Sequence, residues 1–144
     1  MSDVVTLARR WIGTPYRHQG AVKGAGCDCL GLIRGIWTEL CGSVPEVPPP
    51  YTPDWAEPQR HEVLWAAALR HLSPLPPGEP GRGDVLLFRM RPGSVAKHLG
   101  LAAETGETPS FIHSYSEHGV VESPLSLPWR RRIVARFAFP ERAH

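Results

Sequence analysis

Three residues far apart in the chain carry the side chains that a thiol enzyme needs. Cys29 lies at the start of a strongly amphipathic segment, whereas His98 and His113 lie far downstream in two short apolar segments. A cysteine thiol is mostly protonated at neutral pH, and a helix N-terminus together with a nearby imidazole can activate it as a nucleophile. The residue types and their order therefore predict acyl transfer with Cys29 as the nucleophile, His98 as the base and His113 as the group that orients the base.

The segment after Cys29 predicts the helix that presents it. Its apolar residues follow the spacing i, i+3, i+4, i+7, i+8 and i+11, which is typical of a helix with one buried face. These residues are Cys29, Leu32, Ile33, Ile36, Trp37 and Leu40. Asp28 is placed to cap this helix and Gly42 to end it. A shorter helix is expected to begin after Asp3 and to end before Gly13.

The second half of the chain has the pattern of strands. Apolar runs bounded by turn residues predict five strands, which we expect to pair as an antiparallel meander. Their ranges are 85–88, 97–104, 111–115, 120–122 and 133–139, with a turn at 91–94. A further helix is expected over 59–72, and its inward residues are predicted to be Val63, Leu64, Ala67, Ala68 and Leu72. Helices followed by strands predict an α+β fold.

The alternation within two of these strands predicts how the histidines meet. His98 shares a strand face with Gly100 and Ala102, whose small side chains leave room for a helix to approach on that face. A hairpin with its turn at 105–108 places His98 and His113 opposite each other or nearly so. Directly opposed Cβ atoms lie about 4.5–5.5 Å apart, which lets one ring orient the other.

Length and composition limit the other possibilities. The 144 residues predict a single domain, 1–144, in which the proline-rich stretch 44–58 forms an extended surface loop. A formal net charge of +2 gives no reason to expect a nucleic-acid partner, and no apolar run predicts membrane insertion. The first residues show no export signal, so we expect synthesis in the cytoplasm. Five histidines are expected to have no catalytic role: His18, His61, His71, His118 and His144.

Cysteine usage argues for reduced thiols. The chain has three cysteines, an odd number that does not suit a disulfide framework. Cys27 and Cys29 resemble half of a zinc site, but Cys41 lies at the far end of the same predicted helix and cannot complete it. We therefore expect no bound metal, and the role of Cys27 stays open.

These motifs together resemble the NlpC/P60 family of cysteine peptidases, the papain-like cell-wall hydrolases. The matching stretches are Gly13-Thr14-Pro15-Tyr16, Asp28-Cys29-Leu30-Gly31, Gly83-Asp84-Val85, His98-Leu99-Gly100 and Phe111-Ile112-His113. The resemblance implies a papain-like α+β fold, with N-terminal helices packed on an antiparallel sheet of about five strands. It also implies the roles given above for Cys29, His98 and His113, and it places Tyr16 and Asp28 on the substrate and oxyanion side of the site. No cofactor is implied.

The same resemblance implies a substrate and a setting. The family's activity implies hydrolysis of an amide bond in peptidoglycan stem peptides, beside D-γ-glutamyl and diaminopimelate residues. Residues 26–32 are similar to the corresponding stretch of peptidases encoded among the tail genes of phages and of gene transfer agents. That similarity implies assembly with tail hub or baseplate proteins into a virion or tail particle, which delivers the protein to the periplasm or cell wall of a target cell.

Three alternatives stay open at this stage. One is a structural tail-tip adaptor with the same fold and little or no catalysis, which the loop 44–58 and Leu30, where the family usually has serine, both favour. Another is a metal-binding assembly module in which a partner chain adds ligands to Cys27 and Cys29. The last is transamidation on the same fold.

Overall fold

The helices that begin the chain lie against an antiparallel sheet. In the computed structural model, which describes residues 3–42 and 62–140, the helices are α1 (Val4–Arg9), α2 (Cys29–Cys41), α3 (Val63–His71) and α4 (Leu127–Arg130). None of the helices in these ranges is long and apolar enough to cross a membrane. The predicted loop 44–58, the start of the predicted helix at 59–61, and His61 and His144 lie outside the described residues.

The main sheet has six strands in the order β3-β8-β4-β5-β6-β7, and every pairing is antiparallel. The strands are β3 (Ser73–Pro74), β4 (Val85–Arg89), β5 (Ala96–Ala102), β6 (Ser110–Tyr115), β7 (Gly119–Pro124) and β8 (Ile133–Ala138). Five of them correspond to the predicted strands, and β4, β5, β6 and β7 follow one another as the predicted meander. The prediction is wrong for the last strand, because β8 returns to pair with β4 and not with β7. The sixth, β3, and a separate hairpin of β1 (Ala21–Val22) and β2 (Gly26–Cys27) were not expected.

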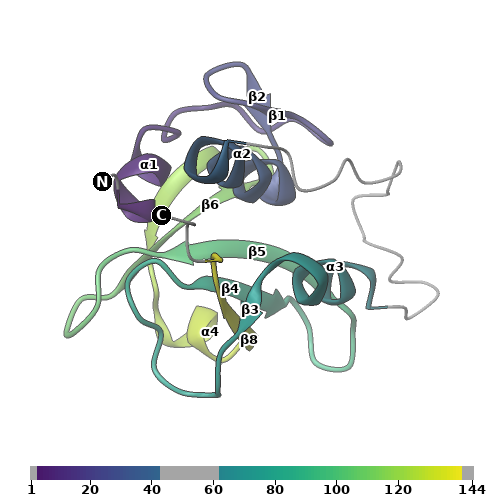
Figure 1. The fold of residues 1–144 in the computed structure, drawn as a ribbon. Coiled ribbons are helices and arrows are strands. Elements are labelled where there is room, and N and C mark those ends of the chain that lie inside the picture. Colours follow the sequence, from purple (N-terminus) through teal and green to yellow (C-terminus); the bar gives the residue numbers. More distant parts are fainter. Residues whose placement is uncertain (1–2, 43–61, 141–144) are drawn as a thin grey trace.

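Because residues alternate along a strand, the sheet has two distinct faces. The apolar face is built on Leu87 of β4, Leu99 and Leu101 of β5, and Ile112 of β6. The histidine face is built on Phe88 of β4, His98 of β5, and Phe111 and His113 of β6. Figure 1 shows α1 and α2 on one side of β5 and α4 on the other. The larger core lies on the apolar face, between the sheet and α2.

Helix α2 confirms its prediction at both ends. Asp28 occupies the N-cap, and its Oδ1 accepts a hydrogen bond of 2.8 Å from the Gly31 N–H. Gly42 ends the helix with a left-handed φ of 79°, which costs glycine little. Gly31 must lack a side chain, because a Cβ there would lie 1.6 Å from the carbonyl oxygen of Gly20. The first turn of α2 is therefore pressed against the loop that precedes β1.

Helix α3 corrects part of its prediction. Its buried residues are Leu64 and Ala68, and Leu72 just after its end is also buried. Val63, predicted to face inward, is 43% exposed, and Ala67 is only half-buried. A helix that meets the rest of the molecule along one row, i, i+4 and i+8, buries that row and leaves the flanking apolar residues outside it.

Candidate active site

The site forms where two neighbouring strands of the sheet separate. Strands β5 and β6 pair at Leu101–Ile112 and Ala102–Phe111. Beyond these pairs β5 continues along β4 and β6 continues along β7, so an opening lies between residues 96–100 and 113–115. We call this opening the β5–β6 fork. It lets groups from the apolar face and the histidine face reach one cleft.

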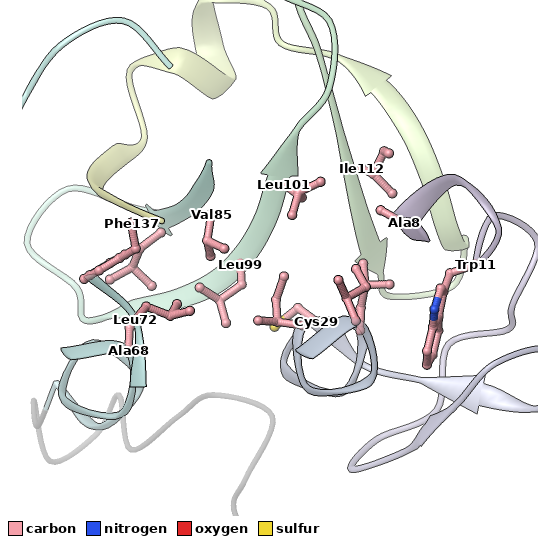
Figure 2. Close-up of a cluster of buried hydrophobic side chains, with 14 of the residues drawn as sticks. Ala8, Trp11, Cys29, Ala68, Leu72, Val85, Leu99, Leu101, Ile112 and Phe137 are labelled. Atoms are coloured by element: carbon pink, nitrogen blue, oxygen red, sulfur yellow. The ribbon is translucent and has the colours of Figure 1, made fainter. Parts of the chain in front are cut away.

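The junction of β2 and α2 fills the fork. The Ser114 hydroxyl donates a hydrogen bond of 2.7 Å to the carbonyl oxygen of Cys27. The backbone N–H of Leu99 is near enough to the Cys29 sulfur to lower the pKa of the thiol. Cys29 is only 6% exposed, and Figure 2 shows it in the apolar core between α2 and the sheet, close to Leu99. The fork thus holds the thiol at the N-terminus of α2.

His98 and His113 meet directly. Their Nε2 and Nδ1 atoms lie 2.7 Å apart, and the two side chains are 7% and 1% exposed. Continuing the register one residue beyond the Leu101–Ile112 pair puts Gly100, rather than His98, level with His113. The histidines are therefore diagonal neighbours, which is the near-opposite arrangement that was predicted. Gly100 leaves room for the side chains of β6, because a Cβ there would lie 2.8 Å from the Phe111 ring and 3.4 Å from the Cβ of His113. The contact occupies Nε2 of His98 and leaves Nδ1 as the nitrogen that can accept a proton from a thiol.

A helix does approach the histidine face, as the small residues there predicted, but it is not the helix that carries Cys29. Helix α2 packs on the apolar face, where Leu99 and Leu101 supply contact area. The histidine face is covered instead by the short helix α4, whose Trp129 ring lies 5.7 Å from His98 and 5.3 Å from His113. The small residues beside His98 therefore make room for aromatic rings and for His113.

Burial keeps both imidazoles neutral. It is the largest cause that lowers the pKa of His98, to about 3, and the neighbouring His113 lowers it further. Burial also lowers the pKa of His113, to about 4, with a smaller contribution from His118. Both rings are therefore uncharged at neutral pH, the state in which His98 can act as a base.

The thiol also rests in its neutral form. Burial raises the pKa of Cys29 to about 12, and the charge of Asp28 raises it further, whereas the backbone N–H groups of Leu99 and Leu30 oppose this shift. The helix N-terminus does favour the thiolate, through the Leu30 N–H, but desolvation and the adjacent carboxylate outweigh this effect on the pKa of Cys29.

Tyr16 reaches the site through a loop attached to β2. Tyr16 forms a β-bridge with Cys27, and the Arg17 N–H donates to the Cys27 carbonyl at 3.1 Å. Burial raises the pKa of Tyr16 to about 12, with further increases from Asp28 and Cys29. Its hydroxyl is therefore a hydrogen-bond donor at all ordinary pH values, as an oxyanion requires.

Asp28 has a structural task that the sequence only partly indicated. Its Oδ1 caps α2, and its Oδ2 accepts a hydrogen bond of 2.8 Å from the Gln19 N–H. His18 lies nearby, with its Nδ1 3.8 Å from the same Oδ2. Asp28 thus fastens the tyrosine loop to the nucleophile helix. Its predicted contact with substrate stays a prediction.

One cleft of about 180 Å³ brings most of these groups together. Its lining is Tyr16, His18, Asp28, Cys29, Met90, Lys97, His98, Ser114, Tyr115 and Ser116. His113 does not line the cleft itself but contacts His98, which does. A larger groove of about 430 Å³ lies between α3, β3 and β8, but the described residues that line it include no cysteine, serine or histidine.

Several residues of the site were not predicted. Ser114 and Trp129 act through packing that joins distant segments, for which the sequence carries no local signal. Tyr115 could have been found, because it shares a strand face with His113 and their rings lie 5.4 Å apart. Of the histidines expected to be unimportant, His18 lines the cleft. His71 packs on Trp37, with ring centroids 5.9 Å apart.

The three cysteines are free thiols, and Cys27 is buried, with a pKa raised to about 11 mainly by burial. Among residues 3–42 and 62–140, no group of three or more His, Cys, Asp or Glu side chains is arranged to hold a metal ion. The chemistry that this arrangement can carry out with its own side chains is nucleophilic attack by a thiol, with an imidazole as proton acceptor and donor.

Comparison with known proteins identifies relatives of this arrangement. The sequence model of the NlpC/P60 family matches residues 13–137. The chain is 29% identical over 123 residues to gamma-DL-glutamyl hydrolase of Bacillus subtilis (strain 168). The aligned region covers 85% of this chain and 25% of that protein, so the chain spans about a quarter of its relative's length.

Two solved structures share the fold. The NlpC/p60 domain of the peptidoglycan hydrolase SagA matches with a TM-score of 0.62 and 20% identity, covering 94% of this chain and 96% of that one. An NlpC/P60 family protein from Bacillus cereus ATCC 10987 matches with a TM-score of 0.60 and 20% identity. That match covers 95% of this chain and 39% of the other.

Proposed function

Because the chain belongs to the NlpC/P60 family, we propose that it is a thiol hydrolase that cleaves an amide bond in the stem peptides of peptidoglycan. Cys29 is the nucleophile, His98 the general base and His113 the residue that orients His98. The observation that carries this proposal is the cleft that Cys29 and His98 line together, with Nε2 of His98 held by His113. Two relatives support the substrate class through their names, one a gamma-DL-glutamyl hydrolase and one a peptidoglycan hydrolase.

Acylation follows from the position of each group. The Cys29 sulfur attacks the carbonyl carbon of the scissile amide while the thiol proton passes to Nδ1 of His98. The oxyanion that forms accepts hydrogen bonds from the Cys29 N–H, in the first turn of α2, and from the Tyr16 hydroxyl. The C–N bond then breaks, and Nδ1 of His98 gives its proton to the departing amine. A thioester on Cys29 remains.

Deacylation uses the same groups with water. A water molecule attacks the thioester carbonyl and gives a proton to His98. The C–S bond breaks, the carboxylic acid leaves, and the Cys29 sulfur takes the proton back. The enzyme returns to the neutral thiol and neutral imidazole of its resting state.

The decisive experiment is digestion of purified peptidoglycan, with the released muropeptides identified by mass spectrometry. We expect a defined cleavage by the wild-type chain that is lost in Cys29→Ala and kept in Cys41→Ala, whose thiol lies on the surface at the other end of α2. A folded wild-type protein that releases nothing contradicts the proposal. The same cleavage by Cys29→Ala contradicts the role of Cys29.

The proposed setting is a phage-like tail or gene transfer agent. It rests on the similarity of residues 26–32 to the peptidases of such particles, and tail hub or baseplate proteins are the expected partners. The particle then delivers the protein, made in the cytoplasm, to the periplasm or wall of the target cell. Proteomic analysis of purified particles tests this. Stoichiometric presence in the tail fraction supports the proposal, and presence only in the envelope or cytosol of the producing cell contradicts it.

A structural adaptor with this fold is the second candidate. The burial of Cys29 and the raised pKa of its thiol favour it, because both reduce reactivity in the free protein. Alkylation separates the two candidates. A Cys29 that stays inert to iodoacetamide, in a protein that cleaves nothing either alone or within its particle, supports the adaptor.

A further inference from the structure

A chain of hydrogen bonds continues past the two histidines. Nε2 of His98 contacts Nδ1 of His113 at 2.7 Å, and Nε2 of His113 contacts the hydroxyl oxygen of Ser123 at 2.9 Å. These hydrogen bonds link three neighbouring strands, β5, β6 and β7. Ser123 belongs to none of the motifs that the chain shares with its family in sequence.

The register of β6 and β7 places Ser123 on the histidine face. Ser123 pairs with Phe111, and His113 pairs with Val121 two residues earlier on β7. Directly paired residues share a face, so Ser123 is the diagonal neighbour of His113. This is the same diagonal relation that His113 has to His98 across β5 and β6. The series of hydrogen bonds from His98 to Ser123 therefore follows from the register of the three strands.

Burial makes the Ser123 contact necessary. His113 is 1% exposed, with the Phe111 ring 4.1 Å and the Trp129 ring 5.3 Å from its own. Aromatic walls offer its Nε2 no strong hydrogen-bond partner. A buried polar atom without a partner is costly, and the Ser123 hydroxyl meets that requirement.

The protonation of His98 during the reaction decides what Ser123 must do. Once His98 has taken the thiol proton, both of its nitrogens carry hydrogen, so its Nε2 must donate to Nδ1 of His113. His113 must then carry its own proton on Nε2, and that N–H needs an acceptor. The oxygen of Ser123 is positioned to accept it.

We propose that Ser123 is a positioning residue that holds His113 in the tautomer with its proton on Nε2. This tautomer presents Nδ1 to His98 as an acceptor and leaves Nδ1 of His98 unprotonated and ready for the thiol. The alternative tautomer of His113 places the His98 proton on Nδ1 and blocks proton transfer from Cys29. The inference rests on the proposed function of His98 and His113.

Nitrogen NMR of the histidine side chains tests the proposal without any substrate. In the folded wild-type protein near pH 7.5, we expect the ¹⁵N shifts of His113 to show a protonated Nε2 and an unprotonated Nδ1. In Ser123→Ala we expect a mixture with protonated Nδ1, and in Ser123→Thr, which keeps a hydroxyl, the wild-type pattern. A wild-type His113 protonated on Nδ1 overturns the proposal, as does an unchanged pattern in Ser123→Ala.

Kinetics supply the second measurement. For Ser123→Ala we expect kcat on a muropeptide to fall about tenfold with little change in KM, because the lost bond matters most when His98 is charged. Ser123→Thr should restore kcat. Ser110→Ala is the matched control, since that serine donates a hydrogen bond to Glu122 and takes no part in the hydrogen bonds that link His98, His113 and Ser123. Inactive wild-type protein refutes the proposed function, while the NMR result still decides the role of Ser123.

Discussion

The two faces of the sheet supply one site but are built in different ways. On the apolar face a single regular helix presents Cys29, and local signals such as the Asp28 cap and Gly42 define that helix. On the histidine face the described residues form no helix of comparable length, and three strands and the short α4 supply the groups. The nucleophile thus depends on local structure, whereas the base depends on contacts between distant segments.

The difference extends to the electrostatics. Cys29 is surrounded by aliphatic side chains and an anionic cap, which keep it a thiol. His98 and His113 are surrounded by aromatic rings, which keep them neutral, yet each finds a polar partner. In the free site the thiol and both imidazoles are therefore neutral at neutral pH. The following changes separate the contributions of the two faces.

Removing the base should have the largest effect. We expect His98→Gln to lower kcat about a thousandfold, in line with the loss of a general base, while KM changes little. Glutamine is neutral and close in size, so the thermal midpoint should stay near that of the wild type. Steady-state kinetics and a thermal melt measure both quantities. A variant with near-normal kcat would show that another group accepts the thiol proton.

Gly31→Ala should disturb the helix that carries Cys29. Alanine inside a helix is normally more stable than glycine by about 1 kcal/mol. Here the new Cβ would lie 1.6 Å from the carbonyl oxygen of Gly20, so the loop or the helix must move. We expect a loss of about 3 kcal/mol in the free energy of unfolding, measured by urea denaturation. Thr38→Ala on the same helix serves as the control and should change it by less than about 1 kcal/mol.

This contrast also explains how far the sequence could predict the molecule. Helix α2 and strands β4–β8 follow from residue periodicity and capping, which are local properties. The meeting of His98 and His113 follows from strand alternation once the hairpin is assumed. The fork, in contrast, brings the β2–α2 junction against β6 through the hydrogen bond between Ser114 and Cys27, and no local sequence pattern predicts a contact between residues so far apart in the chain.

The elements and contacts that were not predicted have no local sequence pattern that could reveal them. Helix α4 has only four residues, one of them proline, so its pattern has no period to detect. Strand β3 has two residues and includes Pro74, which suits the edge position that it occupies. Ser123 contacts His113 only because β7 pairs with β6 in one particular register. The catalytic roles of Cys29, His98 and His113 stay predictions that the experiments above test.

Removing the aromatic cover of the histidine face should lower the stability of the protein and raise the pKa of both histidines. Trp129 contacts His98, His113, Phe88 and Phe111. We expect Trp129→Ala to lower the free energy of unfolding by about 2 kcal/mol, because the side chain is half-buried. Water that enters should also move the pKa of both histidines back toward 6.5, which side-chain NMR titration measures. Trp129→Phe, which keeps an aromatic cover, should change both quantities less.

The low histidine pKa values also predict acid sensitivity. Both histidines have a folded-state pKa below the ordinary value of 6.5, so the unfolded chain binds more protons as the pH falls below 6.5. Their stabilising contribution is complete above that pH and is lost progressively down to about pH 3–4. Near pH 5 each histidine should lower the free energy of unfolding by about 2 kcal/mol relative to pH 8. His113→Asn should remove about half of this difference in urea denaturation, and an unchanged pH dependence would show that carboxylates cause it.

The smallest expected effect comes from the charge beside the nucleophile. Asparagine can keep the cap to the Gly31 N–H, but its amide nitrogen cannot accept the hydrogen bond from the Gln19 N–H, so Asp28→Asn should lower the free energy of unfolding by about 1 kcal/mol. It removes a negative charge that raises the pKa of the Cys29 thiol, while the larger cause, burial, remains. The pKa of Cys29 should therefore fall but stay above its ordinary value, and iodoacetamide should label Cys29 several-fold faster near pH 9. Cys41, exposed at the other end of α2, supplies an internal reference rate. Equal labelling of Cys29 in both proteins would mean that burial alone keeps the thiol protonated, and the nucleophile side would then be controlled by packing in the same way as the histidine side.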